Sequence, residues 1–282
     1  MKKNAVKPVM GLVLVYGFLI VTSAFTVFPV LYALLGAFKT NADVMTGGAI
    51  LPREWIFTNY RAVWEQINFA RYTLNSIYIS SLAAIGSVIL CSMTGYCLAR
   101  KQFIGKKIVL SLYLSTMFIA VGALNLRPLY LLMVELGLHN SLWGIILIHV
   151  GTQNINVFLV SRFISTLPKE LDEAATIDGC GTFQAFWHII MPLIKPILGV
   201  VALFTFRGAW NDYIMSSVFT MTRPELRPLT VGVIALRYGS SAAAEWHYML
   251  TGASISIIPM LIIYLIANKT FISGVTAGSV KG

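Results

Sequence analysis

The sequence predicts an all-α fold, a polytopic bundle of transmembrane helices, on the strength of its composition and of its apolar runs. Of the 282 residues, 57% are hydrophobic and only 11% are charged. The mean hydropathy is +0.77. A water-soluble domain carries about a quarter charged residues, so a soluble globular fold is excluded. Apolar runs of roughly 20 residues, the length of a helix that crosses a bilayer, also recur along the chain.

We expect about six spans in a single transmembrane domain over 1–282, at 9–38, 75–98, 108–133, 143–163, 196–221 and 249–268. The first run follows Lys2 and Lys3 as a secretory signal would, but it continues without charge to Phe38, far beyond an h-region of about 7–15 residues. We therefore expect an uncleaved first span, tilted or kinked at Pro29 because it is longer than the hydrocarbon core.

The positions of Lys and Arg predict the orientation. The segment between the second and third spans concentrates Arg100, Lys101, Lys106 and Lys107. Short cytoplasmic loops carry an excess of such residues, which predicts a cytoplasmic membrane protein with both termini inside. This distribution accounts for the net charge of +10, and nucleic acid is not needed as a partner.

Two long segments, 40–73 and 222–248, then lie outside. Both mix Trp, Tyr, Pro and charged residues, which is typical either of an interfacial belt or of a surface for an extracytoplasmic partner. The three cysteines, Cys91, Cys97 and Cys180, indicate neither a disulfide nor a metal framework and are interpreted as packing residues.

The charged stretch 170–196 interrupts two apolar runs. Pro168 suits the first turn of a helix, and Glu170, Asp172 and Glu173 place negative charge where the helix dipole is positive. Gly179 is expected to end this helix. On these grounds alone the stretch is either an interfacial amphipathic segment or a surface that docks a soluble partner.

A second short helix is expected from Thr182. Its apolar side chains at helical spacing are Phe183, Phe186, Trp187 and Ile190. Pro192 and Pro196 are expected to bend the chain into the fifth span. In the first helix, Ala174 and Ala175 form a smooth strip that allows another surface to approach closely.

The order of residues in this insert resembles a known signature. Glu173-Ala174-Ala175, then Gly179, Ile189 and Pro192, resembles the EAA loop of ABC importer permeases, with Met191 where that family usually has Leu. Asp178, Pro196, the triplet 210–212 and the tail 271–282 are similar to the maltose-type (MalG-like) carbohydrate importers. The resemblance covers essentially the whole chain.

The resemblance implies a type I importer permease that moves a mono- or oligosaccharide across the membrane and is not an enzyme. It implies a second homologous permease, a cytoplasmic ATPase dimer that binds ATP and Mg²⁺, and an extracytoplasmic sugar-binding protein. The coupling loop is expected at about 164–195 and a cytoplasmic tail at about 269–282. The residues carried over for contact with the ATPase are Glu173, Ala174, Ala175, Asp178, Gly179 and Pro192, with Gly274 and Gly278 in the tail.

The chain lacks the Gly-x-x-x-x-Gly-Lys-Ser/Thr loop that cradles nucleotide phosphates. A separate ATPase is therefore required, and we expect no cofactor on this chain.

Polar residues deep in the spans are candidates for the translocation path. At about 1.5 Å per residue, Arg207 lies roughly 16 Å into the fifth span, where a charge is costly unless it is paired or hydrated. Trp210 is adjacent, and Asn211 lies four residues on. The group lines either the path or a structural contact between helices.

The fourth span carries a second polar group. His149, Thr152, Gln153 and Asn156 recur at helical spacing, which predicts one polar stripe through the middle of the membrane. This stripe faces either the path, a partner subunit or a neighbouring helix. His149 is interpreted as a hydrogen-bonding residue, since no second His or Cys lies at ligand spacing and no metal is expected.

Two other functions are compatible with a polytopic membrane protein. An ion-coupled secondary transporter needs intramembrane carboxylates and repeated halves, and only Asp212 lies deep. A membrane-embedded enzyme needs clustered catalytic groups, which the sequence does not offer. The sugar is not identified by the sequence; Arg207, Arg223, Arg227 and Arg237 suggest an acidic one.

Overall fold

The structure is a computed structural model that describes residues 6–47, 49–118, 122–238 and 244–277. Every regular element in these ranges is a helix, which confirms the predicted all-α class. The chain divides into two compact units, one formed by Met1–Phe69 with Val233–Ile257 and the other by Ala70–Gly232 with Ile258–Gly282. The single domain over 1–282 stays a prediction.

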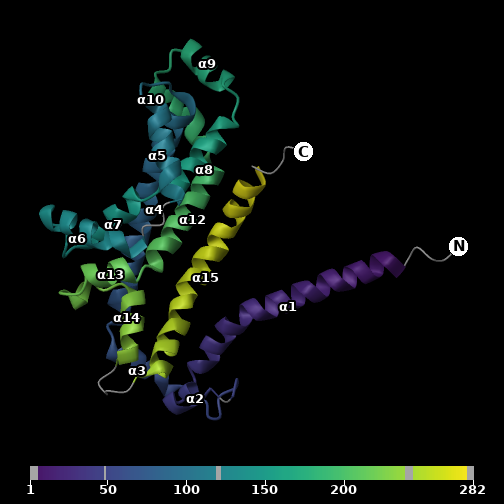
Figure 1. Cartoon of the computed structure of the whole chain (residues 1–282), viewed down its shortest axis with the longest axis vertical. Coiled ribbons are helices and arrows are strands. Elements are labelled where there is room, and N and C mark those ends of the chain that lie inside the picture. Colours follow the sequence, from purple (N-terminus) through teal and green to yellow (C-terminus); the bar gives the residue numbers. More distant parts are fainter. Residues whose placement is uncertain (1–5, 48, 119–121, 239–243, 278–282) are drawn as a thin grey trace. The chain divides into compact units, whose positions relative to one another are not determined.

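Unit 1 is built around the end of its first long helix (Figure 1). Its elements are α1 (Val6–Gly36), α2 (Asn41–Thr46), α3 (Thr58–Gln66), the short helix Leu236–Tyr238 and the first turns of α15 (Trp246–Ala277). The carbonyl of Ala37, just after α1, accepts hydrogen bonds from Asn59 Nδ2 at 2.9 Å and Thr251 Oγ1 at 3.0 Å. These bonds fasten the end of α1 to α3 and α15.

The long helix α4 (Phe69–Arg100) is the central helix of unit 2, against which other elements pack. The elements that follow are α5 (Lys106–Phe118), a 3₁₀ turn (Gly122–Asn125), α6 (Leu126–Glu135), α7 (Leu142–Gly151), α8 (Asn154–Ser165), α9 (Glu170–Ile177), α10 (Thr182–Ala185), a π turn (Phe186–Ile190), α11 (Met191–Leu193), α12 (Lys195–Trp210), α13 (Ile214–Phe219), a 3₁₀ turn (Pro224–Leu226) and α14 (Leu229–Ala235). Two buried apolar clusters run along α4, one shared with α8 and α12 and the other with α6, α7 and α13.

Helix α4 approaches its neighbours closely through glycine. A Cβ atom on Gly86 would lie 2.7 Å from Val150 Cγ2 of α7, and one on Gly95 would lie 2.7 Å from Val160 Cγ1 of α8. Small residues of this kind let helices pack backbone to backbone in membranes. α4 is therefore held tightly against both α7 and α8.

The predicted spans are confirmed in part. Three helical stretches, at 11–36, 69–100 and 246–265, are long and apolar enough to cross a membrane, and two bent pairs raise the count to five in the described residues. The bent pairs are α7 with α8, at 44°, and the helical segment 182–193 with α12, at 79°. The second bend confirms the one predicted at Pro192 and Pro196.

The expectation of continuous helices over 108–133, 143–163 and 196–221 is wrong. A 3₁₀ turn separates α5 from α6, the fourth span is broken between Gly151 and Asn154, and the fifth ends at Trp210. At the last break, Asp212 accepts hydrogen bonds from the backbone N–H groups of Met215 and Ser216, which caps α13. Side chains that bond to nearby backbone in this way compete with helix continuation.

Candidate functional site

The coupling loop begins with the predicted helix. α9 runs over Glu170–Ile177 with Glu170, Asp172 and Glu173 in its first turn. Gly179 ends it with φ of 78°, and the Gly179 and Cys180 N–H groups donate to the carbonyls of Thr176 and Ala175. This pair of bonds is the glycine-terminated arrangement that satisfies the last carbonyls of a helix. The predicted helix stop at Gly179 is confirmed.

The candidate coupling residues divide between two faces of the loop. Glu173, Ala174, Asp178, Gly179 and Pro192 are exposed, whereas Ala175 is only 1% exposed. The smooth strip expected from the two alanines is therefore reduced to Ala174 on the outer face. The roles of all six residues stay predictions.

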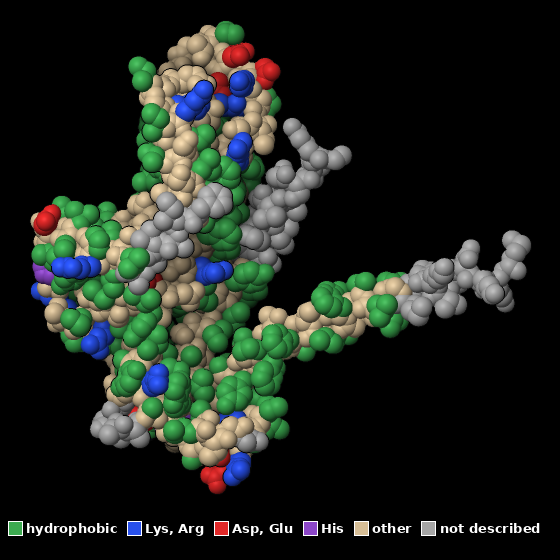
Figure 2. All heavy atoms as spheres, viewed as in Figure 1, with side chains coloured by type: hydrophobic (Ala, Val, Ile, Leu, Met, Phe, Trp, Pro, Cys, Tyr) green, Lys and Arg blue, Asp and Glu red, His purple; other side chains and the backbone are tan. Residues whose placement is uncertain are grey.

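The outer face of the loop also carries large apolar side chains. Ile177 is 86% exposed, Phe183 is 66% exposed and Trp187 is 50% exposed. The rings of Phe183 and Trp187 stack with their centroids 6.4 Å apart. Figure 2 shows charged side chains gathered at this end of unit 2, over α9 and α10. An exposed face that mixes acidic and apolar groups is suited to docking another protein.

The second predicted helix is present but irregular. α10 covers only Thr182–Ala185, and the chain widens into a π turn over Phe186–Ile190. Phe186 and Ile190 are buried in the cluster that α4, α8 and α12 share, as the sequence indicated. Phe183 and Trp187 instead face outward.

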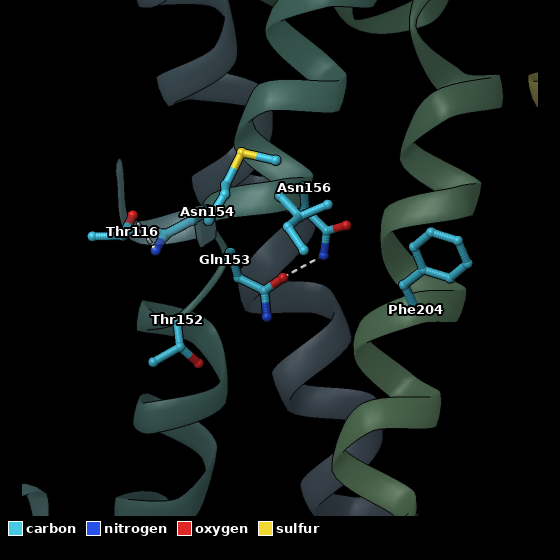
Figure 3. A pocket seen from close by; sticks show the side chains of 8 residues that line it. Thr116, Thr152, Gln153, Asn154, Asn156 and Phe204 are labelled. Carbon is cyan, nitrogen blue, oxygen red and sulfur yellow. Dashed lines mark hydrogen bonds between the residues drawn. The ribbon is translucent and has the colours of Figure 1, made fainter. Parts of the chain in front are cut away.

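The second candidate region is the break between α7 and α8 (Figure 3). The cavity here has a volume of about 400 Å³, and its eight lining residues, all uncharged, are Thr116, Met117, Thr152, Gln153, Asn154, Ile155, Asn156 and Phe204. They come from α5, the broken fourth span and α12. Discontinuous helices recur at substrate sites in transporters because the break frees polar groups within the membrane.

Hydrogen bonds between side chains hold the inner wall of this cavity. The Gln153 carbonyl oxygen accepts from Asn156 Nδ2 and, at 3.2 Å, from Thr205 Oγ1 on α12. All three residues are buried. At the outer wall, Asn154 Nδ2 donates to Thr116 Oγ1 at 2.8 Å. The predicted polar stripe is not borne by one helix, because Thr152 and Gln153 lie in the break between α7 and α8.

His149 connects the two broken spans. Its Nε2 lies 3.8 Å from the Asp212 carboxylate, a contact that is an ion pair only when the imidazole is protonated and is too long for a hydrogen bond. His149 lies in the last turn of α7 and Asp212 precedes α13. The breaks of the fourth and fifth spans therefore face each other.

The other candidate path residues do not share one environment. Arg207 and Asn211 are exposed, and Asn211 Nδ2 donates to the Arg207 carbonyl at 3.0 Å. Trp210 is 3% exposed, and its carbonyl accepts from Thr230 Oγ1 at 2.6 Å. The structure thus places Trp210 in the core of unit 2. Of these three residues, Arg207 and Asn211 are the two that are exposed for contact with a substrate or another chain.

In the tail, Gly274 lies in the last turns of α15, and Gly278 lies outside the described residues. Cys91 is buried, Cys97 is exposed and Cys180 is partly exposed. Among the described residues, no three His, Cys, Asp or Glu side chains are close enough to hold a metal ion.

Sequence reasoning missed Thr116, Asn154 and Phe204 in the cavity, the hydrogen-bond partner Thr205 of its lining residue Gln153, and the contact partners of Asp172. Asn154 was visible as a polar residue in an apolar run. The partners on α4, α5 and α12 are distant in sequence, and no local pattern could have indicated them.

An all-α chain with several helices long and apolar enough to cross a membrane is a polytopic membrane protein, and its exposed charged loop is the candidate docking surface. Residues 9–275 match the family described as "Binding-protein-dependent transport system inner membrane component". The chain belongs to this family, whose members serve transport and not catalysis. Its description names a binding protein as a partner and places the chain in the inner membrane, and ABC permeases of this kind work with an ATPase.

Related proteins carry similar descriptions. The Galactooligosaccharides transport system permease protein GanQ of Bacillus subtilis (strain 168) is 32% identical over 260 residues, which are 91% of this chain and 90% of GanQ. The Melibiose/raffinose/stachyose import permease protein MelC of the same organism is 33% identical over 235 residues, 83% of this chain and 84% of MelC.

A solved structure, of a bacterial ABC transporter involved in the import of the acidic polysaccharide alginate, has a chain with the same fold. The TM-score is 0.77 at 23% identity, over 96% of this chain and 99% of that one.

Proposed function

We propose that this chain is one of two homologous permease subunits of an ABC importer that moves an oligosaccharide across the cytoplasmic membrane. ATP and Mg²⁺ bind only on the separate ATPase subunits, and this chain holds no cofactor and catalyses no reaction. The observation that carries the proposal is the exposed face of α9, where Glu173, Ala174 and Ile177 stand outward on a helix anchored to the membrane bundle.

The coupling loop and both termini lie on the cytoplasmic side in this proposal. The support is the cluster of basic residues 100–107, which is adjacent to the loop: Lys101 Nζ donates to Thr182 Oγ1 of α10 at 3.0 Å. The ATPase would then meet the loop, and the sugar-binding protein would meet the opposite ends of the spans.

The names of related permeases and the lining of the cavity both support a neutral sugar as the substrate. The names of GanQ and MelC specify galactooligosaccharides and melibiose, raffinose and stachyose, all neutral sugars. The cavity at the α7–α8 break offers amides, hydroxyls and the ring of Phe204, and no charged side chain lines it. Hydroxyl-rich neutral ligands suit such a surface, so we propose a neutral oligosaccharide and place the translocation path along this cavity.

An ion-coupled secondary transporter, the alternative suggested by the sequence, has no support in a binding-protein-dependent family. The acidic-sugar alternative rests on Arg207, Arg223, Arg227 and Arg237, none of which lines the cavity.

The test is reconstitution. The chain is tagged, purified in mild detergent with its co-purifying subunits, and placed in lipid nanodiscs. ATP hydrolysis is then measured with binding proteins loaded with raffinose, galactooligosaccharide or an oligouronate. Recovery of a second permease and an ATPase, with stimulation by a neutral sugar, would support the proposal. Stimulation by the oligouronate alone would reject the neutral substrate, and transport by this chain alone with an ion gradient would reject the importer.

A further inference from the structure

The inner face of the coupling helix is tied to the last turn of α4. Arg100 Nε lies 2.9 Å from Asp172 Oδ2, and the side chain of Arg100 is only 6% exposed. The two atoms form an ion pair without a hydrogen bond, since neither has a hydrogen-bond partner. The other arm of the guanidinium does form hydrogen bonds: one NH2 group donates to the carbonyls of Leu167 at 2.9 Å and Pro168 at 3.0 Å.

A tyrosine one turn earlier completes the contact. The Tyr96 hydroxyl donates to Asp172 Oδ1 at 2.9 Å. Tyr96 is 3% exposed, and its ring packs on Phe186 of the π turn with centroids 5.2 Å apart. α4 therefore holds both oxygens of the Asp172 carboxylate, one through a charge and the other through a hydroxyl.

The ion pair between Arg100 and Asp172 is not explained by its contribution to stability. The Arg100 side chain is buried, and the Asp172 side chain is 25% exposed. Desolvation of the buried charge cancels much of the attraction, so such a pair gains little over apolar packing, whereas removing Asp172 would leave the buried guanidinium without its counter-charge. What such a pair does provide is a fixed geometry, and the planar fork of arginine fixes direction better than lysine would. The contact therefore specifies how α9 sits on α4.

One face of α9 contacts α4, and the other is exposed. Asp172 is held by α4, whereas Glu173 and Ala174 are exposed on the docking face. A force applied to the outer face can therefore reach α4 through Asp172. Since α4 packs through Gly86 on α7 and through Gly95 on α8, it contacts the fourth span on both sides of its break.

We propose that Tyr96, Arg100 and Asp172 form a clasp that makes α4 move with the coupling helix, so that movement of the ATPase changes the break between α7 and α8. The three are positioning residues, since they touch neither nucleotide nor sugar. This inference rests on the proposed function and names the route by which the loop acts. The opposing view is that the clasp only helps the loop to fold.

The experiment uses the assembled importer in proteoliposomes and measures the sugar transported per ATP hydrolysed. Arg100→Gln and Asp172→Asn each remove one charge of the clasp. We expect both complexes to hydrolyse ATP while the transport ratio falls on the order of tenfold, a typical size for energetic coupling between sites. Arg100→Lys keeps the charge without the fork and should recover only part of the ratio. The doubly substituted variant Arg100→Asp with Asp172→Arg should recover more than either single reversal.

Glu170→Gln is the matched control, because it removes an exposed charge from the same first turn of α9 and should leave the ratio unchanged. Should Arg100→Gln fail to assemble, Tyr96→Phe removes a single hydrogen bond and should still lower the ratio by a smaller factor. A normal ratio in either assembled variant would overturn the clasp. Absence of sugar transport by the wild-type complex would instead reject the proposed function.

Discussion

The two candidate regions of unit 2 are held in opposite ways. At the coupling loop, a buried guanidinium and a carboxylate 2.9 Å apart fix the helix that faces the partner. At the break between α7 and α8, neutral amides and a hydroxyl bond to one another around a cavity without charged lining. In the proposed importer, the charged contact would pass on a force from the ATPase, and the neutral groups would let a hydroxylated ligand move without being trapped.

Of the substitutions that test the comparison between these two regions, we expect the largest loss of transport from one on the exposed face of α9. Glu173→Lys reverses an exposed charge on α9, and we expect sugar uptake to fall by at least about tenfold, the scale of coupling between sites. Membrane insertion should be unchanged because the side chain is exposed. Uptake of labelled sugar into cells checks this, with the amount of chain in the membrane as control. An equal loss in Glu170→Lys would show that only the total charge of the loop matters.

The contact between α4 and the broken span can be tested by a single methyl group. In Gly95→Ala, the new Cβ would lie 2.7 Å from Val160 Cγ1 and 3.1 Å from the Ser161 backbone nitrogen. Overpacking of this kind costs about 1–3 kcal/mol, so the unfolding temperature of the purified chain should fall. Gly208→Ala is the control, because nothing lies within 4 Å of its added Cβ. An unchanged unfolding temperature in Gly95→Ala would mean that α4 and α8 are not tightly packed.

The neutral network at the break is expected to fail when its shared acceptor is removed. Gln153→Leu leaves Asn156 Nδ2 and Thr205 Oγ1 without that acceptor, and buried polar groups left unpaired cost about 1–3 kcal/mol each. The triple variant Gln153→Leu, Asn156→Leu and Thr205→Val should recover part of the stability, because the Asn156 amide and the Thr205 hydroxyl are removed together with their acceptor. The His149 carbonyl, which accepts from Gln153 Nε2, loses this donor equally in the single and the triple variant. Thermal unfolding measures both. A triple variant less stable than the single one would contradict the network.

The smallest effect concerns the end of the coupling helix. Gly179 has φ of 78°, and alanine there costs roughly 1–2 kcal/mol. Since the strain is local, we expect transport to fall only a few-fold, by less than in Glu173→Lys. Uptake measured side by side with that variant gives the comparison. A complete loss of uptake in Gly179→Ala would show that the position of the loop depends on this turn more than on the clasp.

The helix class and the stop of α9 at Gly179 followed from the sequence, because composition, apolar length and glycine conformation act locally. The breaks in the fourth and fifth spans did not, because the residues between the helical pieces, Thr152-Gln153 and Asn211-Asp212-Tyr213, include neither Pro nor Gly. Asp212 caps a new helix only once the chain has turned.

The sequence also could not predict which residues of α9 are buried and which are exposed. Helical spacing alone could not distinguish buried Ala175 from exposed Ala174, because that depends on which side α4 covers. The contact of Asp172 with Arg100 joins residues far apart in sequence, and only the folded chain brings them together.

The uncharged lining of the cavity has a consequence for energetics in a living cell. Moving one elementary charge through a membrane potential of 100 mV changes its energy by about 2.3 kcal/mol. The eight lining residues carry no charge, so a rearrangement of that cavity around a neutral sugar moves none through the field. The energy of moving a neutral sugar past these residues would then stay the same whether the membrane potential is present or absent, and the potential would not drive this step.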